Sequence, residues 1–395
     1  MPDSQLHIPL TLFVLFTAAK LLGELSERLH QPAIVGEILA GVLLGPSILG
    51  WVAPNQVLTA LSELGVMFLL FRVGLEVNPA DLIKQSGSAM LVATLGVVLP
   101  MGLGWGIITW WGLPQAEALF VGAAMVATSV GITAQVLASK GLLNHPASRV
   151  ILAAAVIDDV LGLLVLAAVS SVASGSLKVI EIATTAAIAV AFVTVIALWG
   201  NRLMGKVVPR VQESARAAEG EYAMALILLF GLSALAVVAG VAAIVGAFFA
   251  GMALSGRVGH RVHELTHGAA ELLIPFFLAG IGLHVELGAF RSGPLVTLTA
   301  VIVVAAVASK FLGCGVASLK MGKLDAIRIG VGMIPRGEVG MVVAQLGLSL
   351  GAISNEIYAV VVFMAVATTV IAPPLLNVAF RGLKAESPEE TYRLG

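Results

Sequence analysis

The chain alternates between long apolar runs and short polar breaks, and this pattern predicts a bundle of transmembrane helices. A helical run of about 18 residues crosses a hydrocarbon core of roughly 30 Å. We count thirteen runs, with approximate limits at 8–28, 33–50, 57–77, 86–112, 115–140, 146–173, 177–206, 219–240, 242–256, 264–285, 291–319, 323–350 and 354–382. Only a break at Gly240 divides the eighth run from the ninth. Because the runs are continuous rather than alternating, the strands of a membrane barrel are excluded.

Composition agrees with this pattern. Of the 395 residues, 59% are hydrophobic and 11% are charged, and the mean hydropathy is +1.02. Such a chain has too little polar surface to coat a soluble fold, so we expect an all-α polytopic membrane protein. The single cysteine, Cys314, lies in an apolar run, which excludes a disulfide framework and a cysteine-based metal site. The first run is long enough to remain as a helix, so no cleavable signal peptide is expected.

Positive charges predict the orientation of the chain. If the N-terminus is outside, cytoplasmic helix ends hold seventeen of the 22 Lys and Arg residues, whereas outside ends hold Lys178 and Arg291. The remaining three, Lys20, Lys310 and Arg336, lie inside runs. A missed helix would destroy this alternation, so the bias supports the odd helix number as well. We expect a bacterial inner (plasma) membrane protein whose C-terminus is cytoplasmic.

Two sequence matches indicate an internal duplication. The stretch Ala-Ile-Val-Gly at 33–36 returns at 243–246, an offset of 210, and the Gly-Leu pair at 74–75 returns at 282–283, an offset of 208. Chance is the alternative, because Gly, Ala, Ile and Val are abundant in this chain.

Polar, glycine-containing interruptions fall at matching places in the two halves. The first is Thr-Ser-Val-Gly-Ile-Thr at 128–133, in the fifth run, and the second is Pro-Arg-Gly-Glu-Val-Gly at 335–340, in the twelfth. If the repeats are runs 1–6 and 8–13, an odd number of crossings separates equivalent helices, so the two six-helix halves are inverted. Inverted repeats with discontinuous helices are typical of secondary transporters, whose site lies near the bilayer midplane. For either break alone, a simple kink against a neighbouring helix is the alternative.

Three charged residues stand where charges are costly. Asp158 and Asp159 lie in a run that is otherwise apolar, and Lys310 lies deep in another. Each such residue costs roughly 2.5 to 3.5 kcal/mol at a helix centre, and the three together cost on the order of 8 kcal/mol. Adjacent helix positions differ by about 100°, so the two carboxylates face different ways. The alternatives are a structural salt-bridged pair for the acids and snorkelling to an interface for Lys310.

Carboxylate oxygens suit a hard cation such as Na⁺ or Li⁺. Hydroxyls and backbone carbonyls at the first break can complete a dehydrated ion shell, and the candidate residues there are Thr128, Ser129 and Thr133. Burial disfavours the charged form of acids and amines alike, so protons compete with the cation. Alternating access turns that competition into exchange.

Other polar residues have architectural interpretations. Arg336 and Glu338 lie at the second break, where opposite charges offset the dipoles of exposed half-helix ends. Glu37 and Glu76 lie near helix ends and are predicted to be structural or gating residues rather than ion ligands.

Three histidines, His260, His263 and His267, share one helical face. They suggest a metal site or a pH sensor. Their segment is predicted to be a cytoplasmic loop without a nearby acidic triad, so we favour a solvated face.

Four stretches together resemble the monovalent cation/proton antiporters of the NapA type: 31–41, 127–133, 156–160 and 335–338. The resemblance spans essentially the whole chain. It implies a core domain, residues 86–173 and 291–382, that moves against a dimerisation domain, residues 1–80 and 219–285. A linker helix and loop at 174–218 and a cytoplasmic tail at 383–395 complete the implied homodimeric antiporter, in which the discontinuous helices cross.

The resemblance also implies roles for site residues. Asp159 is the main Na⁺ carboxylate, Asp158 is the second, and Asp158 forms a salt bridge with Lys310 when the site is empty. The electroneutral branch of the family carries Asn in place of the first Asp. This sequence carries Asp158 there, so the resemblance implies electrogenic exchange of two protons per sodium. Such a protein is a transporter in pH homeostasis rather than an enzyme. Its partners are Na⁺ or Li⁺, protons and the bilayer, with no cofactor and no nucleic acid.

The duplication does not extend to the charged residues when the offset of 208 is applied. Asp158 and Asp159 then correspond to Val366 and Ala367, and Lys310 corresponds to Gly102. On this register the scaffold is duplicated and the chemistry is not.

Three other functions remain open from the sequence. Potassium/proton exchange is the first, as in glutathione-gated relatives, which usually carry a cytosolic nucleotide-binding domain. The chain stops soon after the last run, which favours sodium. A sodium-coupled organic-anion symporter of the same fold is the second, although it needs neither adjacent acids nor a buried Lys. A channel or structural scaffold is the third.

Overall fold

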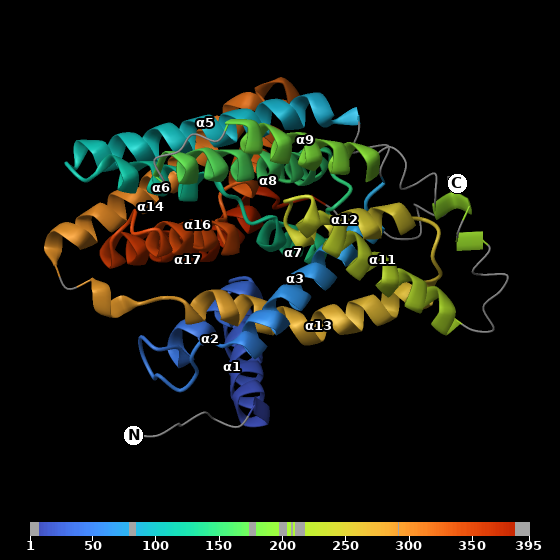
Figure 1. The fold of residues 1–395 in the computed structure, drawn as a ribbon. Helices are drawn as coiled ribbons and strands as arrows, with labels where there is room; N and C mark the ends of the chain where they lie inside the picture. The colour runs from blue at the N-terminus through green and yellow to red at the C-terminus, as the bar shows by residue number, and fades with distance from the viewer. Residues whose placement is uncertain are drawn as a thin grey trace.

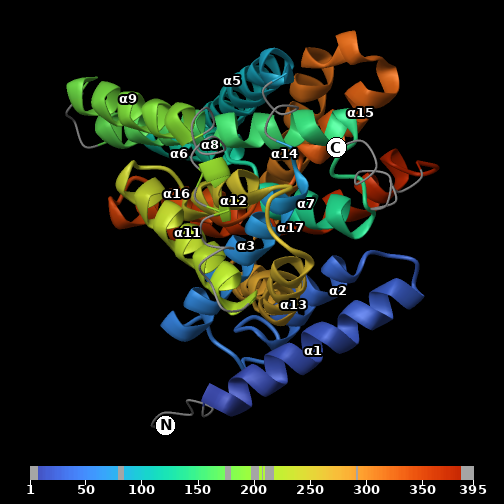
Figure 2. The same ribbon diagram turned by 90° about the vertical axis from the view of Figure 1, so that its right-hand side faces the viewer.

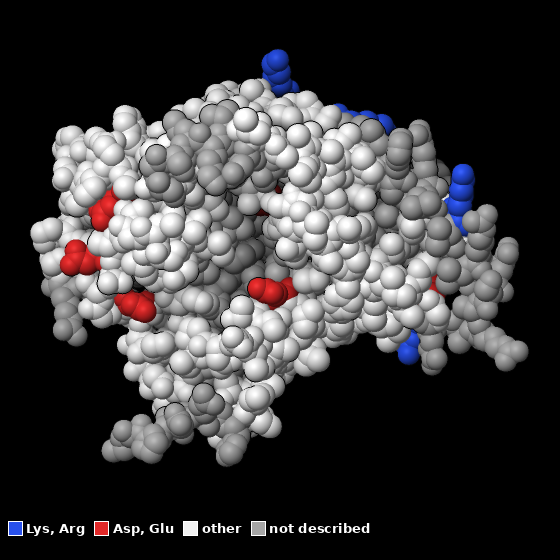
Figure 3. Space-filling model, in the orientation of Figure 1, with Lys and Arg blue, Asp and Glu red and all other residues white. Residues whose placement is uncertain are grey.

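The computed structural model describes residues 8–78, 84–173, 179–196, 204–206, 208–209, 218–290 and 292–383, and these residues form helices and connections without any strand (Figure 1). Nine helices of this described part are long and apolar enough to cross a membrane, and four shorter apolar helices accompany them. The predicted all-α polytopic fold is therefore confirmed. On the face shown in Figure 3, most of the surface carries no charged side chain.

Six helices form one packed group, which occupies the bottom and the right of Figure 1 and whose first helix is lowest in Figure 2. They are α1 (Ile8–Arg28), α2 (Ala33–Leu44), α3 (Gln56–Glu76), α11 (Ala218–Val238), α12 (Ala243–Leu254) and α13 (His260–Leu283). The helix α3 packs against both α12 and α13, while α1 packs on α2 and α11 packs on α12. We call these six helices the scaffold group.

Eight other helices form a second group, which lies toward the top and left of Figure 1 beside the scaffold group. They are α5 (Ser86–Trp110), α6 (Gln115–Val126), α7 (Val130–Ser139), α8 (Pro146–Ala173), α14 (Gly293–Ala317), α15 (Lys323–Gly332), α16 (Glu338–Ser349) and α17 (Asn355–Ala379). Within this core group α5 packs on α6, α8 and α14, and α17 packs on α14, α15 and α16. The helix α9 (Val179–Val195) lies against α8, and two 3-10 turns, η2 (Leu287–Ala289) and η3 (Leu319–Met321), flank α14.

The helix bounds correct two details of the sequence analysis, and a third lies partly outside the described residues. The helix α2 ends at Leu44 rather than near residue 50, because Gly45 and Pro46 follow in a non-helical turn. The helix α13 begins at His260, so the histidine segment expected to be a loop is helical. The predicted seventh run, 177–206, has α9 at Val179–Val195, while 197–203 lie outside the described residues. Gly240 divides α11 from α12 with a φ of 78°.

Glycines make the closest helix contacts, and these contacts repeat between the halves. A Cβ on Gly36 of α2 would lie 1.9 Å from the Leu22 carbonyl oxygen of α1. A Cβ on Gly246 of α12 would lie 2.3 Å from the Leu232 carbonyl oxygen of α11. The two glycines are 210 residues apart, and so are the two leucines. The sequence match at 33–36 and 243–246 therefore corresponds to the same kind of helix crossing in each half.

A second pair of glycine contacts joins helices from the two halves of the chain. A Cβ on Gly74 of α3 would lie 2.2 Å from the Phe248 carbonyl oxygen of α12, and one on Gly282 of α13 would lie 2.2 Å from the Ile38 carbonyl oxygen of α2. Each contact joins a helix of the first half to one of the second. Side chains larger than hydrogen cannot occupy these positions without separating the helices.

The helices that precede α8 and α17 end in the same geometry. Gly141 has a φ of 63° and donates its N–H to the Ala138 carbonyl at 3.0 Å, and Gly351 has a φ of 66° and donates to the Leu348 carbonyl at 3.0 Å. These pairs are 210 residues apart. The offset is therefore not constant at 208 in this part of the chain: α7 and α16 begin 208 residues apart, and α16 is two residues longer than α7.

Candidate ion-binding site

Two helices of the core group are interrupted, and the interruptions contact each other. The first separates α6 from α7, and the second separates α15 from α16. The Ser129 N–H donates to the Pro335 carbonyl at 2.8 Å, and the Thr133 hydroxyl donates to the Gly332 carbonyl at 2.7 Å. Backbone groups released from a helix need partners in an apolar interior, and here each break supplies partners for the other.

Glycine permits this close approach at the second break. A Cβ on Gly337 would lie 2.6 Å from the Ser129 hydroxyl oxygen. The predicted site residues Thr128, Ser129 and Thr133 are all buried at this junction. The structure thus brings the three predicted first-break residues against the second break, and backbone carbonyls and hydroxyls are concentrated there.

Asp158 of α8 and Lys310 of α14 form an ion pair in the core group. The Lys310 Nζ lies 3.0 Å and 3.1 Å from the two Asp158 carboxylate oxygens. The exposed fractions of the two side chains are 0% for Lys310 and 1% for Asp158. The ammonium therefore does not snorkel to an interface. It packs beside Gly96 of α5, where an added Cβ would lie 3.3 Å from Nζ.

Asp159 has different surroundings, as expected for adjacent helix positions. Its partly buried side chain lines a cavity of about 10 Å³, roughly the space of one water molecule. The other lining residues are apolar and come from α3, α7, α8 and α12: Leu70, Val130, Leu152, Val156, Ile244, Val245 and Phe248. Asp159 therefore lies at the boundary between the core and scaffold groups, whereas Asp158 lies inside the core group.

Arg336 at the second break is fully buried. Its Nη2 donates to the Ala306 carbonyl of α14 at 3.1 Å, and it is close enough to Asp158 and Lys310 to interact with both electrostatically. The backbone of Glu338 begins α16, but its side chain lies outside the described residues, so its predicted charge compensation with Arg336 stays a prediction.

Two residues missed by the sequence analysis hold the second break. The Arg336 N–H donates to the Thr368 hydroxyl at 3.2 Å, and the Thr369 hydroxyl donates to the Arg336 carbonyl. Both threonines are buried in α17. The available signal was a pair of adjacent hydroxyl residues in the middle of an apolar run.

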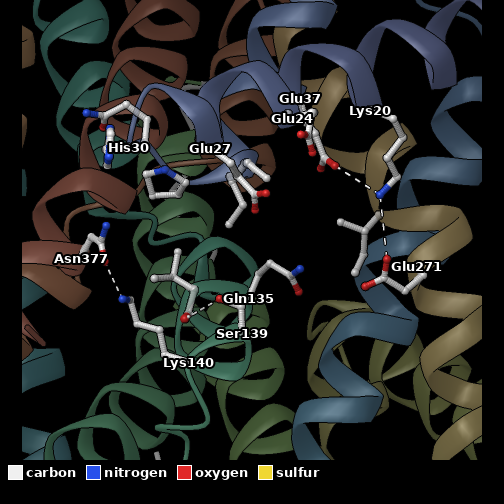
Figure 4. A pocket seen from close by; sticks show the side chains of 17 residues that line it. Lys20, Glu24, Glu27, His30, Glu37, Gln135, Ser139, Lys140, Glu271 and Asn377 are labelled. Atoms are coloured by element: carbon white, nitrogen blue, oxygen red, sulfur yellow. Dashed lines mark hydrogen bonds and ion pairs between the residues drawn. The ribbon is translucent and has the colours of Figure 1, made fainter. Parts of the chain in front are cut away.

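A cavity of about 640 Å³ lies between the scaffold group and the helices α7 and α17 (Figure 4). Its lining includes four acidic residues, Glu24, Glu27, Glu37 and Glu271, and two lysines, Lys20 and Lys140. The Lys20 Nζ lies 3.4 Å from Glu37 Oε1 and 3.9 Å from Glu271 Oε2. Figure 4 shows Lys140 bonded to Asn377 on the side opposite this cluster. Of these residues, the sequence analysis singled out Glu37, as structural or gating, and Lys20, as a lysine inside a run.

The remaining candidates have local partners. His260 Nδ1 lies 3.3 Å from Glu264 Oε1 one helical turn later, and Glu76 Oε1 lies 3.6 Å from Arg72 Nε one turn earlier. Across the part of the chain that the structure describes, no group of three His, Cys, Asp or Glu side chains is placed to hold a metal.

Comparison with known proteins decides the family. A model described as "Sodium/hydrogen exchanger, transmembrane" matches residues 12–381. The chain belongs to the sodium/hydrogen exchanger family. It is 34% identical to the high-affinity Na⁺/H⁺ antiporter NhaS3 of Synechocystis sp., over 96% of this chain and 91% of that one. It is 32% identical to the Na⁺/H⁺-K⁺ antiporter GerN of Bacillus cereus, over 93% of this chain and 95% of that one.

A solved structure of the same fold class supports the architecture. The sodium proton antiporter MjNhaP1 of Methanocaldococcus jannaschii matches with a TM-score of 0.70 at 16% identity, over 94% of this chain and 95% of that one. At 16% identity, this likeness shows the fold alone. The assignment of the scaffold and core groups to a dimerisation domain and a moving core domain stays a prediction.

Proposed function

We propose that this protein exchanges Na⁺ or Li⁺ for protons across the bacterial inner membrane, with Asp159 as the main ion carboxylate and Asp158 as its partner. The observation that carries the proposal is the pair of adjacent acids, one buried and one partly buried, beside two mutually bonded helix breaks. One acid is neutralised by Lys310, while the other lines a cavity between the two helix groups. A structural salt bridge needs one carboxylate, and the second acid is explained by ion binding.

Charge balance links the cation to protons. A cation that binds between Asp158 and Asp159 displaces Lys310 from Asp158, and an ammonium left without a carboxylate in a sealed site releases its proton. Asp159 gives up a second proton when it binds the cation. Two protons then exchange for one Na⁺, so the cycle is electrogenic, and net charge crosses the membrane.

Access to the site alternates when the core group moves against the scaffold group. Asp159 lies at their boundary, so a displacement there exposes it to one side or the other. The 640 Å³ cavity lies beside the end of α1 and the end of α7, which the distribution of Lys and Arg assigns to the cytoplasm. Under the same assignment the N-terminus is outside and the C-terminus is cytoplasmic. The homodimer, in which scaffold helices pair, comes from the resemblance to the NapA-type antiporters.

Relatives support sodium and keep potassium as the second candidate cation. NhaS3 is named a Na⁺/H⁺ antiporter and GerN a Na⁺/H⁺-K⁺ antiporter. These relatives are transporters rather than enzymes, and exchange by this protein would serve pH homeostasis. The organic-anion symporter is disfavoured, because a binding cavity of about 10 Å³ beside Asp159 suits a small ion.

The experiment is reconstitution in proteoliposomes that contain a pH-sensitive dye and hold an imposed proton gradient. Addition of Na⁺ or Li⁺ is expected to dissipate the gradient, and Asp159→Asn is expected to abolish the response. Asp325→Asn is the matched control, because Asp325 pairs with Arg328 in the first turn of α15, away from the acids. A sodium response that survives in Asp159→Asn would refute the site assignment.

Two further readouts of the same assay test coupling. Because protons and Na⁺ compete, the apparent KM for Na⁺ is expected to rise as the pH falls. An imposed membrane potential is expected to change the exchange rate, and indifference to the potential would contradict exchange of two protons for one sodium. Adding K⁺ in place of Na⁺ separates the two candidate cations.

A further inference from the structure

The backbone of Arg336 depends on two adjacent hydroxyls. Arg336 lies between α15 and α16, outside both helices, so the regular hydrogen bonds of a helix do not serve its peptide groups. Its N–H donates to Thr368 Oγ1 at 3.2 Å, and its carbonyl accepts from the Thr369 hydroxyl. Thr368 donates its own proton to the Ala365 carbonyl at 3.0 Å. Because both threonines are 0% exposed, water cannot replace them.

These threonines lie in α17 next to the position that corresponds to the acid pair of α8. The offset is 210 at Gly141 and Gly351 but 209 where α8 and α17 begin, at Pro146 and Asn355, so Asp159 corresponds to Thr368 or Thr369. In each half, therefore, the long helix that follows a broken helix carries two adjacent polar residues. In α8 the pair is acidic, and in α17 it binds the backbone of the second break.

Arg336 is fixed from two directions. The α17 hydroxyls hold its peptide groups, and the Ala306 carbonyl of α14 holds its guanidinium at 3.1 Å. Ala306 lies one helical turn before Lys310, which pairs with Asp158. The position of the second break thus determines where a buried positive charge lies relative to the Asp158–Lys310 pair.

We infer that Thr368 and Thr369 are positioning residues of the transport site, which hold the second break so that Arg336 stays beside the Asp158–Lys310 pair. This inference rests on the proposed exchange function. Loss of either hydroxyl leaves a buried peptide group without its partner, so the break relaxes and the field at the acid pair changes. Both the exchange rate and its dependence on pH then change.

The test compares Thr368→Val, Thr369→Val and the double variant with Thr368→Ser and Thr369→Ser in the proteoliposome assay. Each Val variant is expected to lower the maximal rate about tenfold and to displace the pH profile, while each Ser variant keeps the hydroxyl and stays near the wild type. Thr299→Val is the matched control, because Thr299 is a buried core-group threonine whose hydroxyl bonds within its own helix, to the Leu295 carbonyl.

Hydrogen exchange of the peptide 333–340 provides a readout independent of transport. The Arg336 amide is expected to exchange faster in Thr368→Val than in Thr368→Ser, because the valine lacks an acceptor for the amide N–H. If the Val variants do not fold, the comparison of Thr369→Ser with Thr369→Ala in both assays takes their place.

Distinct outcomes separate this inference from the proposed function. The positioning role would be overturned if the Val variants kept the wild-type transport rate, pH profile and hydrogen exchange while Asp159→Asn was inactive. The proposed cation/proton exchange would then remain intact. Equal losses in the Ser and Val variants would also overturn it, because the hydroxyl would then be irrelevant. Activity in Asp159→Asn would instead refute the proposed site.

Discussion

Two lysines of this protein pair with carboxylates of neighbouring helices, in opposite surroundings. Lys310 and Asp158 are sealed in the core group, with exposed fractions of 0% and 1% and contacts of 3.0 and 3.1 Å. The Lys20 side chain is 42% exposed beside the large cavity, and its contacts with Glu37 and Glu271 are 3.4 and 3.9 Å. The same chemical groups therefore form one dry ion pair and one wet cluster.

The difference determines which pair can couple ion movements. Two charges at 4 Å interact by about 1 kcal/mol in water and about 4 kcal/mol at the effective dielectric constant of a protein. In the wet cluster, water and dissolved ions replace a lost partner at little cost. In the sealed pair, one charge cannot change without a compensating change in the other, which is the property that an exchanger needs.

The largest expected effect is that of removing one member of the sealed pair. Lys310→Met leaves Asp158 buried without its partner and is expected to cost about 3–5 kcal/mol of unfolding free energy. The thermal unfolding midpoint in detergent measures this loss, and the exchange rate in proteoliposomes is expected to fall to background. An unchanged midpoint would mean that Asp158 finds another partner and that the pair is not sealed.

Removing both charges sharpens the comparison. In the double variant Lys310→Met with Asp158→Asn, both charges of the pair are absent and Arg336 keeps its bond to the Ala306 carbonyl, so the unfolding free energy is expected to return to within about 1 kcal/mol of the wild type. Exchange is not expected to return, because the proton carrier and one ion carboxylate are both absent. Recovery of exchange together with stability would show that the pair is merely structural.

A glycine next to the sealed lysine provides a smaller perturbation. A Cβ at Gly96 would lie 2.9 Å from Cys314 Sγ and 3.3 Å from Lys310 Nζ, so Gly96→Ala is expected to cost about 1–3 kcal/mol through overpacking. Gly102→Ala in the same helix is the control, because no atom lies within 4 Å of its added Cβ. The control is expected to stabilise the helix by about 0.5–1 kcal/mol. Equal midpoints for the two variants would contradict the tight packing around Lys310.

The fold was largely predictable because the bilayer fixes helix length and excludes unpaired backbone. The prediction of helix bounds from hydropathy failed where apolar residues form a turn rather than continue a helix. The run predicted to reach residue 50 stops at Leu44, because hydropathy does not distinguish an apolar turn from an apolar helix. The histidine segment was assigned to a loop for the opposite reason, since polar residues begin α13.

The sequence predicted those site residues whose placement in an apolar helix costs much free energy. Asp158, Asp159 and Lys310 stood out because charges in an apolar run are expensive. Thr368 and Thr369 did not, because a hydroxyl in a helix can bond its own backbone and carries little cost. A changing repeat offset also hid their nearness to the position equivalent to the acid pair, since the offset is 208 where α7 and α16 begin and 209 where α8 and α17 begin.

The smallest expected effect belongs to the wet cluster. Lys20→Met removes a partly exposed ammonium whose partners border a cavity of about 640 Å³. The change in unfolding free energy is expected to be below about 1 kcal/mol and to shrink further as the salt concentration rises, because dissolved ions screen exposed charges. Thermal unfolding at low and high salt measures both quantities, with Lys310→Met as the reference. A loss as large and as insensitive to salt as that of Lys310→Met would show that the Lys20 cluster is sealed from water, and the distinction between the two pairs would then fail.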